Sequence, residues 1–237
     1  MTSERALALA HLGRFDAAHG ASARDPSDRG RHVLAYIAAA RGRFGDALTL
    51  CRAITSRGAA PFATHHAFLT AASVLRQMGR HDEARSADVS AHRLAPDAAG
   101  RAHASIGLAA DAVGRGDADR CASMLAEAGA CAPAGDWRVA VRLGWVLAEH
   151  AMLRDRPAHA AEAAGAAAAL SRRAGAVRHE AKSLLFLGAA MAAAGDERAA
   201  RTLSAAGTIA TRIGAAPIAH VARALLEGGQ SPHLEHG

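Results

Sequence analysis

The stretch 184–200, LLFLGAAMAAAGDERAA, decides the fold of this chain. An apolar helical segment leads to Gly195, two acidic residues follow, and a second Ala-rich segment begins. Similar stretches surround five other turn residues, Gly13, Gly42, Gly79, Gly116 and Asp155. The six turn residues are 29, 37, 37, 39 and 40 residues apart. Repetition at this period predicts a solenoid of helical hairpins.

Small residues occupy the same two places in every repeat. Seven residues before each turn stand Ala6, Ala35, Ala72, Ala109, Ala148 and Gly188, and five residues after it stand Ala18, Ala47, Ala84, Cys121, Ala160 and Ala200. Small side chains allow the two helices of a hairpin to approach closely. Pro96 and Pro133 each lie 17 residues beyond a turn glycine, where a second helix is expected to end.

These residues resemble the tetratricopeptide repeat (TPR), in which a small residue, a glycine turn, a second small residue and a closing proline recur. The match is best at Leu184, Leu187, Gly188, Met191, Gly195 and Ala200, and at Gly79, Ala84, Ala91 and Pro96. The longer C-terminal repeats also resemble those attached to large ATPase-type transcriptional regulators of high-GC bacteria. The resemblance implies an all-α, right-handed α-solenoid of about six TPR-like hairpins with a C-terminal capping helix.

The turn residues also predict where the helices begin and end. First helices are expected near 3–12, 30–41, 63–78, 98–114, 136–153 and 176–194, and second helices near 15–24, 44–57, 81–93, 117–129, 157–173 and 197–213. A capping helix is expected near 216–227. We therefore expect residues 1–227 to form one elongated repeat domain and residues 228–237 to be a frayed tail.

Composition and charge exclude several classes of protein. No apolar run approaches the roughly 18 residues of a membrane span, and the N-terminus has no apolar signal core, so a soluble, cytoplasmic protein is expected. The 28 basic and 22 acidic side chains give a net charge of +6. Because the arginines are dispersed among acidic residues and aromatic residues make up only 3% of the chain, the sequence argues against nucleic acid as a partner.

The sequence offers no catalytic or metal-binding constellation. Adjacent residues His65 and His66 point about 100° apart on a helix, and His233 and His236 lie in the tail. The three cysteines are widely spaced and odd in number. We therefore expect a protein that is not an enzyme and that holds neither a metal nor a cofactor.

Partner binding is expected on the concave side, which the first helices of a solenoid line. Helical spacing predicts that this face carries Arg29, His32, Tyr36, His66, Leu69, Ser73, Arg76, Gln77, His103, Ile106, Arg142, Trp145, Glu149, Lys182 and Leu185. Basic, histidine-containing surfaces with amphipathic aromatics suit a protein or peptide that is acidic or has a free carboxylate. The structural alternative is that Trp145 and Leu185 fill the packing between repeats.

Three functions follow from these observations. The leading hypothesis is a non-catalytic adaptor that binds a protein or peptide on its concave face. The alternative is a regulatory or sensor module related to the repeats of the large transcriptional regulators, which binds a partner or a small effector. An enzyme is the third hypothesis, because a solenoid fold does not by itself establish function. The sequence leaves open a homo-oligomer and a groove that is filled by the chain's own C-terminal helix.

Overall fold

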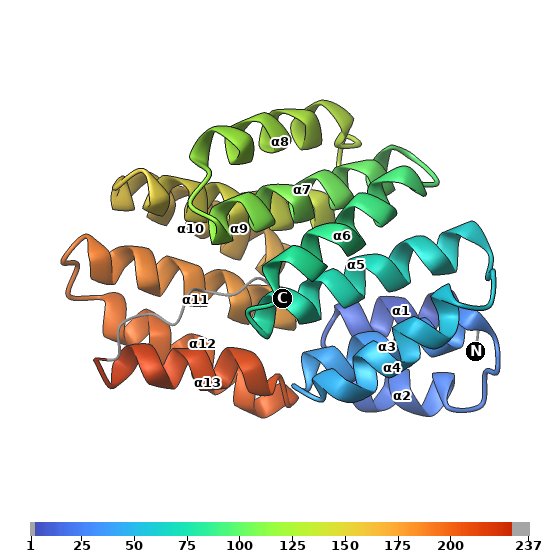
Figure 1. Cartoon of the computed structure of the whole chain (residues 1–237). Helices are drawn as coiled ribbons and strands as arrows, with labels where there is room; N and C mark the ends of the chain where they lie inside the picture. The colour runs from blue at the N-terminus through green and yellow to red at the C-terminus, as the bar shows by residue number, and fades with distance from the viewer. Residues whose placement is uncertain (1–2, 229–237) are drawn as a thin grey trace.

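The computed structural model of the 237-residue chain describes residues 3–228, which form thirteen α-helices and no strand (Figure 1). The first six are α1 (Ser3–His11), α2 (Phe15–Ser22), α3 (Asp28–Ala40), α4 (Phe44–Thr55), α5 (Pro61–Gln77) and α6 (His81–Arg93). The others are α7 (Ala98–Gly114), α8 (Ala118–Cys131), α9 (Trp137–Leu153), α10 (Pro157–Arg173), α11 (Val177–Ala193), α12 (Ala199–Ile213) and α13 (Ala216–Leu226). The predicted all-α helical repeat fold is confirmed.

The turn residues explain why the helices end where they do. The five turn glycines have φ between 72° and 81°, and Asp155, at 54°, is the one non-glycine residue with positive φ in the described chain. At the third turn, the backbone N–H of Arg80 donates to the carbonyl of Leu75, a bond that closes the last turn of α5. Each predicted helix boundary lies within two residues of the observed one, so the spacing of the turns does set the helix lengths.

The small residues pack between helices at every predicted position except one. Eleven of the twelve are buried, and a Cβ atom on Gly188 would stand 2.7 Å from the Leu203 side chain. The exception is Ala200, which is exposed. The expectation for Ala200 was wrong because Asp196 accepts a hydrogen bond from the backbone of Arg198, and α12 begins at Ala199, which takes the buried place instead.

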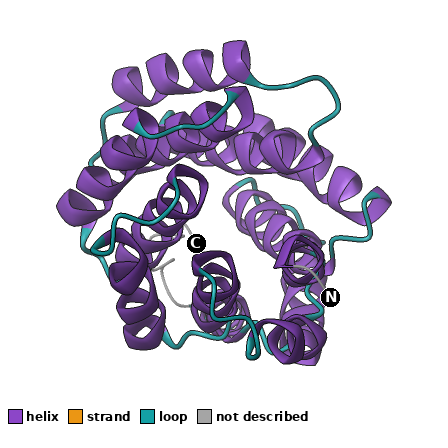
Figure 2. Ribbon diagram, turned by 90° about the vertical axis from the view of Figure 1, so that its right-hand side faces the viewer, coloured by secondary structure: helices purple, strands orange, loops and turns teal. Residues whose placement is uncertain are grey.

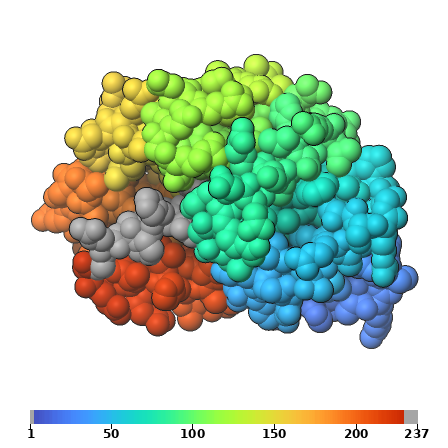
Figure 3. Space-filling view, in the orientation of Figure 1, coloured from blue at the N-terminus to red at the C-terminus, as the bar shows by residue number. Residues whose placement is uncertain are grey.

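The solenoid closes on itself, so the expected elongated shape is wrong. Viewed from the side in Figure 2, the helices follow one another around a ring, and in Figure 3 the surface of the C-terminal helices (red) adjoins that of the N-terminal helices (blue). The place for a Cβ on Gly13 is 3.3 Å from the backbone nitrogen of Arg178, and that on Gly42 is 3.5 Å from the Pro217 ring. We call this closed arrangement the ring.

One hydrophobic core joins the two ends of the chain. Phe15 and Ile37 from the first two hairpins pack in the same buried cluster as Leu203 and Ile218 from the last helices. Helix α13 buries Ile218 and Ala222, so it caps the last hairpin as predicted. Alanine at so many interhelical positions brings the helices close together, and small rotations between hairpins then accumulate into a full turn.

Two expectations about the chain as a whole stay as predictions. The right-handed sense of the solenoid is one of them. The frayed tail is the other, because residues 229–237 lie outside the described part of the chain. Between residues 3 and 228, no helix has both the length and the hydropathy that a membrane span requires.

Candidate functional site

The inside of the ring contains a cavity of about 80 Å³ that is lined mostly by residues with polar or charged side chains. Its walls come from α3, α5, α9 and α11, together with the last residue of α1. The lining residues are His11, His32, Tyr36, Ala39, His66, Leu69, Thr70, Ser73, Gln77, Arg138, Arg142, Trp145, Arg178 and His179. Three of them are arginines, and no aspartate or glutamate of the described chain is among them. We call this space the central cavity.

Two of the arginines come from one face of α9. Arg138 and Arg142 are four residues apart, so their side chains leave the helix side by side, and both are half-buried. Neither guanidinium group has a hydrogen-bond or carboxylate partner among residues 3–228. Burial lowers the pKa of Arg142 to about 10 and also lowers the pKa of Arg138, because protein replaces the water that would stabilise these charges.

The third arginine approaches the central cavity from α11. Arg178 is buried, its Nη1 donates to the hydroxyl of Tyr36 over 3.4 Å, and its Cζ lies 5.5 Å from the centre of the Tyr36 ring. The Nε of Arg178 is also buried and has no hydrogen-bond partner in the described residues. Tyr36 therefore orients a guanidinium group that keeps unused donors.

The four histidines of the central cavity do not add to its charge at neutral pH. Burial lowers the pKa of His32 to about 4 and that of His66 to about 2. Burial, followed by the charges of nearby arginines, lowers the pKa of His11 and His179 well below the usual value. The charge of the cavity therefore comes from its arginines, and the imidazoles provide neutral donors and acceptors.

Histidine and tryptophan rings pack against one another in the wall of the central cavity. Nδ1 of His179 donates to the backbone carbonyl of His11 over 3.2 Å, and the His179 ring stacks on Trp145 with 5.4 Å between ring centres. Trp145 is fixed in turn because its Nε1 donates to Ser183 Oγ over 2.8 Å. Residues of the central cavity thus make one of the contacts that close the ring.

A smaller cavity of about 20 Å³ adjoins the central one and shares Arg142 and Trp145 with it. Its walls also include Arg76, Glu149 and Lys182. Nζ of Lys182 lies 4.5 Å from the centre of the Trp145 ring, a distance typical of a cation–π contact. Burial lowers the pKa of Lys182 well below its usual value.

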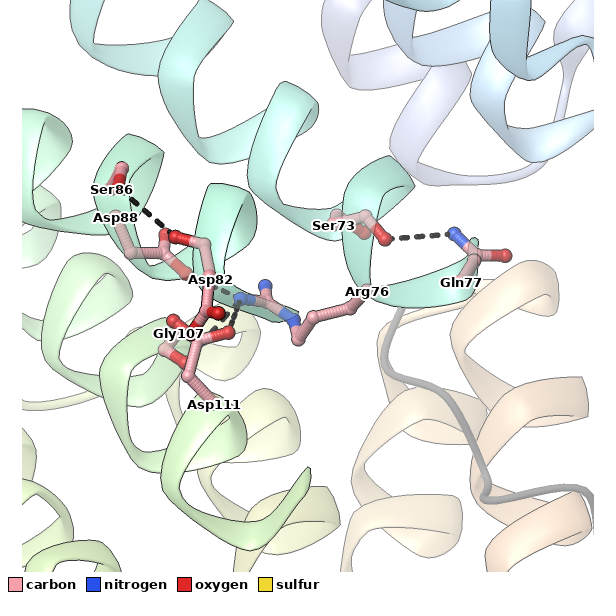
Figure 4. A network of polar contacts seen from close by, with 8 residues as sticks. All are labelled: Ser73, Arg76, Gln77, Asp82, Ser86, Asp88, Gly107 and Asp111. Carbon is pink, nitrogen blue, oxygen red and sulfur yellow. Dashed lines mark hydrogen bonds and ion pairs between the residues drawn. The ribbon is translucent and has the colours of Figure 1, made fainter. Parts of the chain in front are cut away.

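Arg76 belongs to a buried ion network that connects three helices (Figure 4). From α5 its Nη1 donates to Asp88 on α6, and over 2.9 Å to Asp111 on α7. Arg76 is only 2% exposed, and both aspartates are fully buried. A Cβ atom at position 107 would stand 2.4 Å from the Asp88 carboxylate, so only glycine leaves room for it. The charge of Arg76 is thus paired with carboxylates inside the network, which joins neighbouring hairpins, while Arg76 Nε, Asp88 Oδ1 and Asp111 Oδ2 are buried without a hydrogen-bond partner in the described residues.

The predicted partner-binding residues lie mostly inside the ring. Nine of the fifteen are buried: His32, Leu69, Arg76, His103, Ile106, Trp145, Glu149, Lys182 and Leu185. Five are half-buried, namely Tyr36, His66, Ser73, Gln77 and Arg142, and only Arg29 is exposed. Twelve of the fifteen line one of the two cavities. The periodicity therefore selected residues of the inner face, most of which are buried or half-buried around a cavity that is partly open to solvent.

Three predicted residues lie outside both cavities. Arg29 pairs with Glu4 over 2.7 Å at the surface and covers the Phe62 ring. Leu185 belongs to the core that joins the two ends of the chain, in agreement with the packing alternative. His103 is buried in α7, and burial lowers its pKa well below the usual value.

Six residues of the central cavity were not predicted, namely His11, Ala39, Thr70, Arg138, Arg178 and His179. Arg138 precedes Arg142 by one helical turn, and Arg178 precedes Lys182 in the same way, so the spacing used for the other residues could have found them. His11 and His179 had no such signal, because they meet only through the closure of the ring.

The described chain contains no group of three or more His, Cys, Asp or Glu residues placed to hold a metal ion. Cys51, Cys121 and Cys131 are free thiols. The tail histidines His233 and His236 lie outside the described residues.

Comparison with known proteins supports the fold and adds nothing about the site. No family model matches the chain, and no curated protein matches its sequence. Among solved structures, the chain is similar to the crystal structure of BtubC (BKLC) from P. vanneervenii, with a TM-score of 0.51 and 20% sequence identity. The match covers 91% of this chain and 92% of that chain. At this level of identity the similarity concerns the fold alone.

Proposed function

We propose that the protein is a non-catalytic binding module of the TPR type whose ligand presents an anionic group to the central cavity. The observation that carries this proposal is that Arg138, Arg142 and Arg178 converge on one cavity without a carboxylate partner among residues 3–228. Burying charges without a counterion costs folding free energy. An anion that binds between these arginines would offset that cost, since such pairs form strong charge-assisted hydrogen bonds.

Three carboxylates lie near these arginines. Asp136 accepts hydrogen bonds from the backbone of Arg138 and Val139 and so caps α9. Asp88 acts on Arg142 only at a distance, because its carboxylate is held by Arg76. The third, Glu149, lines the adjoining cavity with Lys182 and not the central one. The positive charge of the cavity is therefore available to a ligand.

The adaptor expected from the sequence takes a modified form in this proposal. An acidic protein or peptide is one carrier of an anionic group, but residues such as Trp145 are buried inside the ring. A protein partner would therefore have to bind to an opened ring, or insert only a small anionic group into the central cavity. A cytoplasmic location and the lack of catalysis are parts of the proposal.

The sensor hypothesis is favoured by a separate observation. His11, Tyr36, Arg178 and His179 line the cavity and also make the polar contacts between the two ends of the chain. A ligand at these residues would change the stability of ring closure, which is the property that a regulatory module needs. Small-angle scattering tests this: the radius of gyration should change on ligand binding, and a rigid binding module would show no change.

The test of the proposed function is a thermal shift experiment with a panel of anions that includes carboxylates, phosphate and acidic peptides with free C-termini. At least one anion should raise the melting temperature of the wild-type protein, because a ligand that binds only the folded state stabilises it. The double variant Arg138→Gln/Arg142→Gln should lose this response. The exposed Arg201→Gln serves as the matched control and should keep it. A panel without any stabilising anion, or an unchanged response in the double variant, would contradict the proposal.

A further inference from the structure

We infer that the group taken by the central cavity is a phosphate or phosphoryl dianion on a small molecule, enclosed by Arg138, Arg142 and Arg178. This inference rests on the proposed function and names the ligand class of the same site. Three properties of the cavity carry it: its net charge, its volume and the directions from which the arginines approach.

The charge of the cavity matches a dianion better than a single carboxylate. Three guanidinium groups line it, and its histidines are neutral at pH 7. A carboxylate would neutralise one of the three positive charges, whereas a phosphate monoester carries about −1.5 to −2 at this pH. Because Arg178 is buried and Arg138 and Arg142 are half-buried, water screens their mutual repulsion only in part. The ligand that neutralises most of the excess positive charge is therefore favoured.

The volume of the cavity sets the size of the enclosed group. A water molecule needs about 10–15 Å³ of such space, so a cavity of about 80 Å³ has room for about five to eight small atoms. A phosphate group has five non-hydrogen atoms. The space is partly open to solvent, so the rest of the ligand can extend out of it. The contacts between Gly13 and Arg178 and between Gly42 and Pro217 close the ring around it.

The arginines approach from two different helices. Arg138 and Arg142 lie on neighbouring turns of α9, and Arg178 comes from the first turn of α11, where Tyr36 holds it. Donors that arrive from separate directions suit the oxygens of a tetrahedral anion, which point apart, while the two oxygens of a carboxylate lie in one plane. Gln77 and Thr70 add neutral groups from α5.

The test is isothermal titration calorimetry on the full chain with inorganic phosphate, sulfate, glycerol 3-phosphate, acetate and succinate. We expect the phosphate compounds and sulfate to bind, and acetate and succinate to bind at least about tenfold more weakly. Tighter binding of glycerol 3-phosphate than of phosphate would indicate an ester as the ligand, and equal binding would indicate the free anion. Both results support the inference.

Variants connect the binding to the three arginines. Arg142→Gln should weaken phosphate binding about 10- to 100-fold, because a hydrogen bond to a charged group is lost. Arg201→Gln, at the exposed surface of α12, should leave the affinity unchanged. Circular dichroism of each variant shows whether the helices are intact.

The outcomes separate this inference from the proposed function. If succinate or acetate binds as tightly as phosphate and depends on Arg142, the phosphate class is wrong and the anion-binding function stands. If phosphate binds equally well to the wild type and to Arg142→Gln, the cavity is not the phosphate site. If no anion binds at all, both proposals fail.

Discussion

Replacing Arg76 with Met tests whether the buried ion network holds the hairpins together. The substitution keeps a long side chain in place but leaves Asp88 and Asp111 fully buried without their cation. Removing one partner of a buried ion network typically costs about 3–5 kcal/mol. An independent estimate agrees, since two hydrogen bonds to charged groups contribute about 1.5–3 kcal/mol each. Such a loss is a large share of a typical folding free energy of about 5–15 kcal/mol.

The pH dependence of the stability lost in Arg76→Met distinguishes an effect of charge from an effect of packing. In the native protein, burial already raises the pKa of Asp88 to about 7, although Arg76 opposes the shift. Without Arg76 the pKa of Asp88 should rise further, so the folded variant binds more protons than its unfolded chain between pH 4 and pH 7. The destabilisation should therefore shrink as the pH falls.

The assay is urea unfolding followed by circular dichroism at pH 7.5 and pH 5.0. The triple variant Arg76→Met/Asp88→Asn/Asp111→Asn removes all charges with little change in shape and should recover most of the stability. A loss below about 1 kcal/mol for Arg76→Met, or a loss that grows on acidification, would refute this reasoning.

Four further changes test other parts of the structure. Arg142→Gln should raise the melting temperature of the ligand-free protein by about 2–4 °C, as expected for a gain of about 1 kcal/mol when a half-buried charge without a carboxylate partner among the described residues is removed; a lower melting temperature would contradict this. Ala84→Leu should cost about 1–3 kcal/mol in urea unfolding because Ala84 is fully buried, whereas Ala200→Leu at an exposed site should cost almost nothing; equal effects would disprove the assigned register. Asp155→Gly should stabilise the protein by about 0.5–1 kcal/mol, since φ of 54° favours glycine, and an unchanged unfolding midpoint would argue against this turn geometry. Because burial lowers the pKa of His32 to about 4, stability should fall as the pH drops below 6.5 by up to about 3 kcal/mol from this residue, and His32→Gln should flatten the pH profile measured by thermal unfolding.

The local structure could be predicted from the sequence because each helix ends at a residue with a clear physical signal. Gly79 and Gly116 adopt positive φ, and Pro96 and Pro133 lie just beyond the ends of α6 and α8, as the pattern indicated. The error at Ala200 arose from a side-chain hydrogen bond of Asp196, which delays the start of α12. Composition and spacing carry no information on such a local bond.

The closure of the ring could not be predicted in the same way. It depends on small angles between successive hairpins that add up over the whole chain, and no single residue encodes them. Gly13 was interpretable as a turn residue, but its contact with Arg178 joins positions far apart in the sequence. The same limitation explains the candidate site: helical spacing identified Arg142 and Trp145 on the inner face, while the burial of that face and the role of His11 follow from closure.

The central claim is that the cavity inside the ring takes an anion between three arginines, and crystallography with selenate tests it most directly. Selenate is a tetrahedral dianion whose anomalous scattering locates it without a model of the ligand. The account predicts an anomalous peak in the central cavity within hydrogen-bond distance of Arg138, Arg142 and Arg178. A cavity that contains only water, with selenate bound at surface arginines alone, would contradict the account.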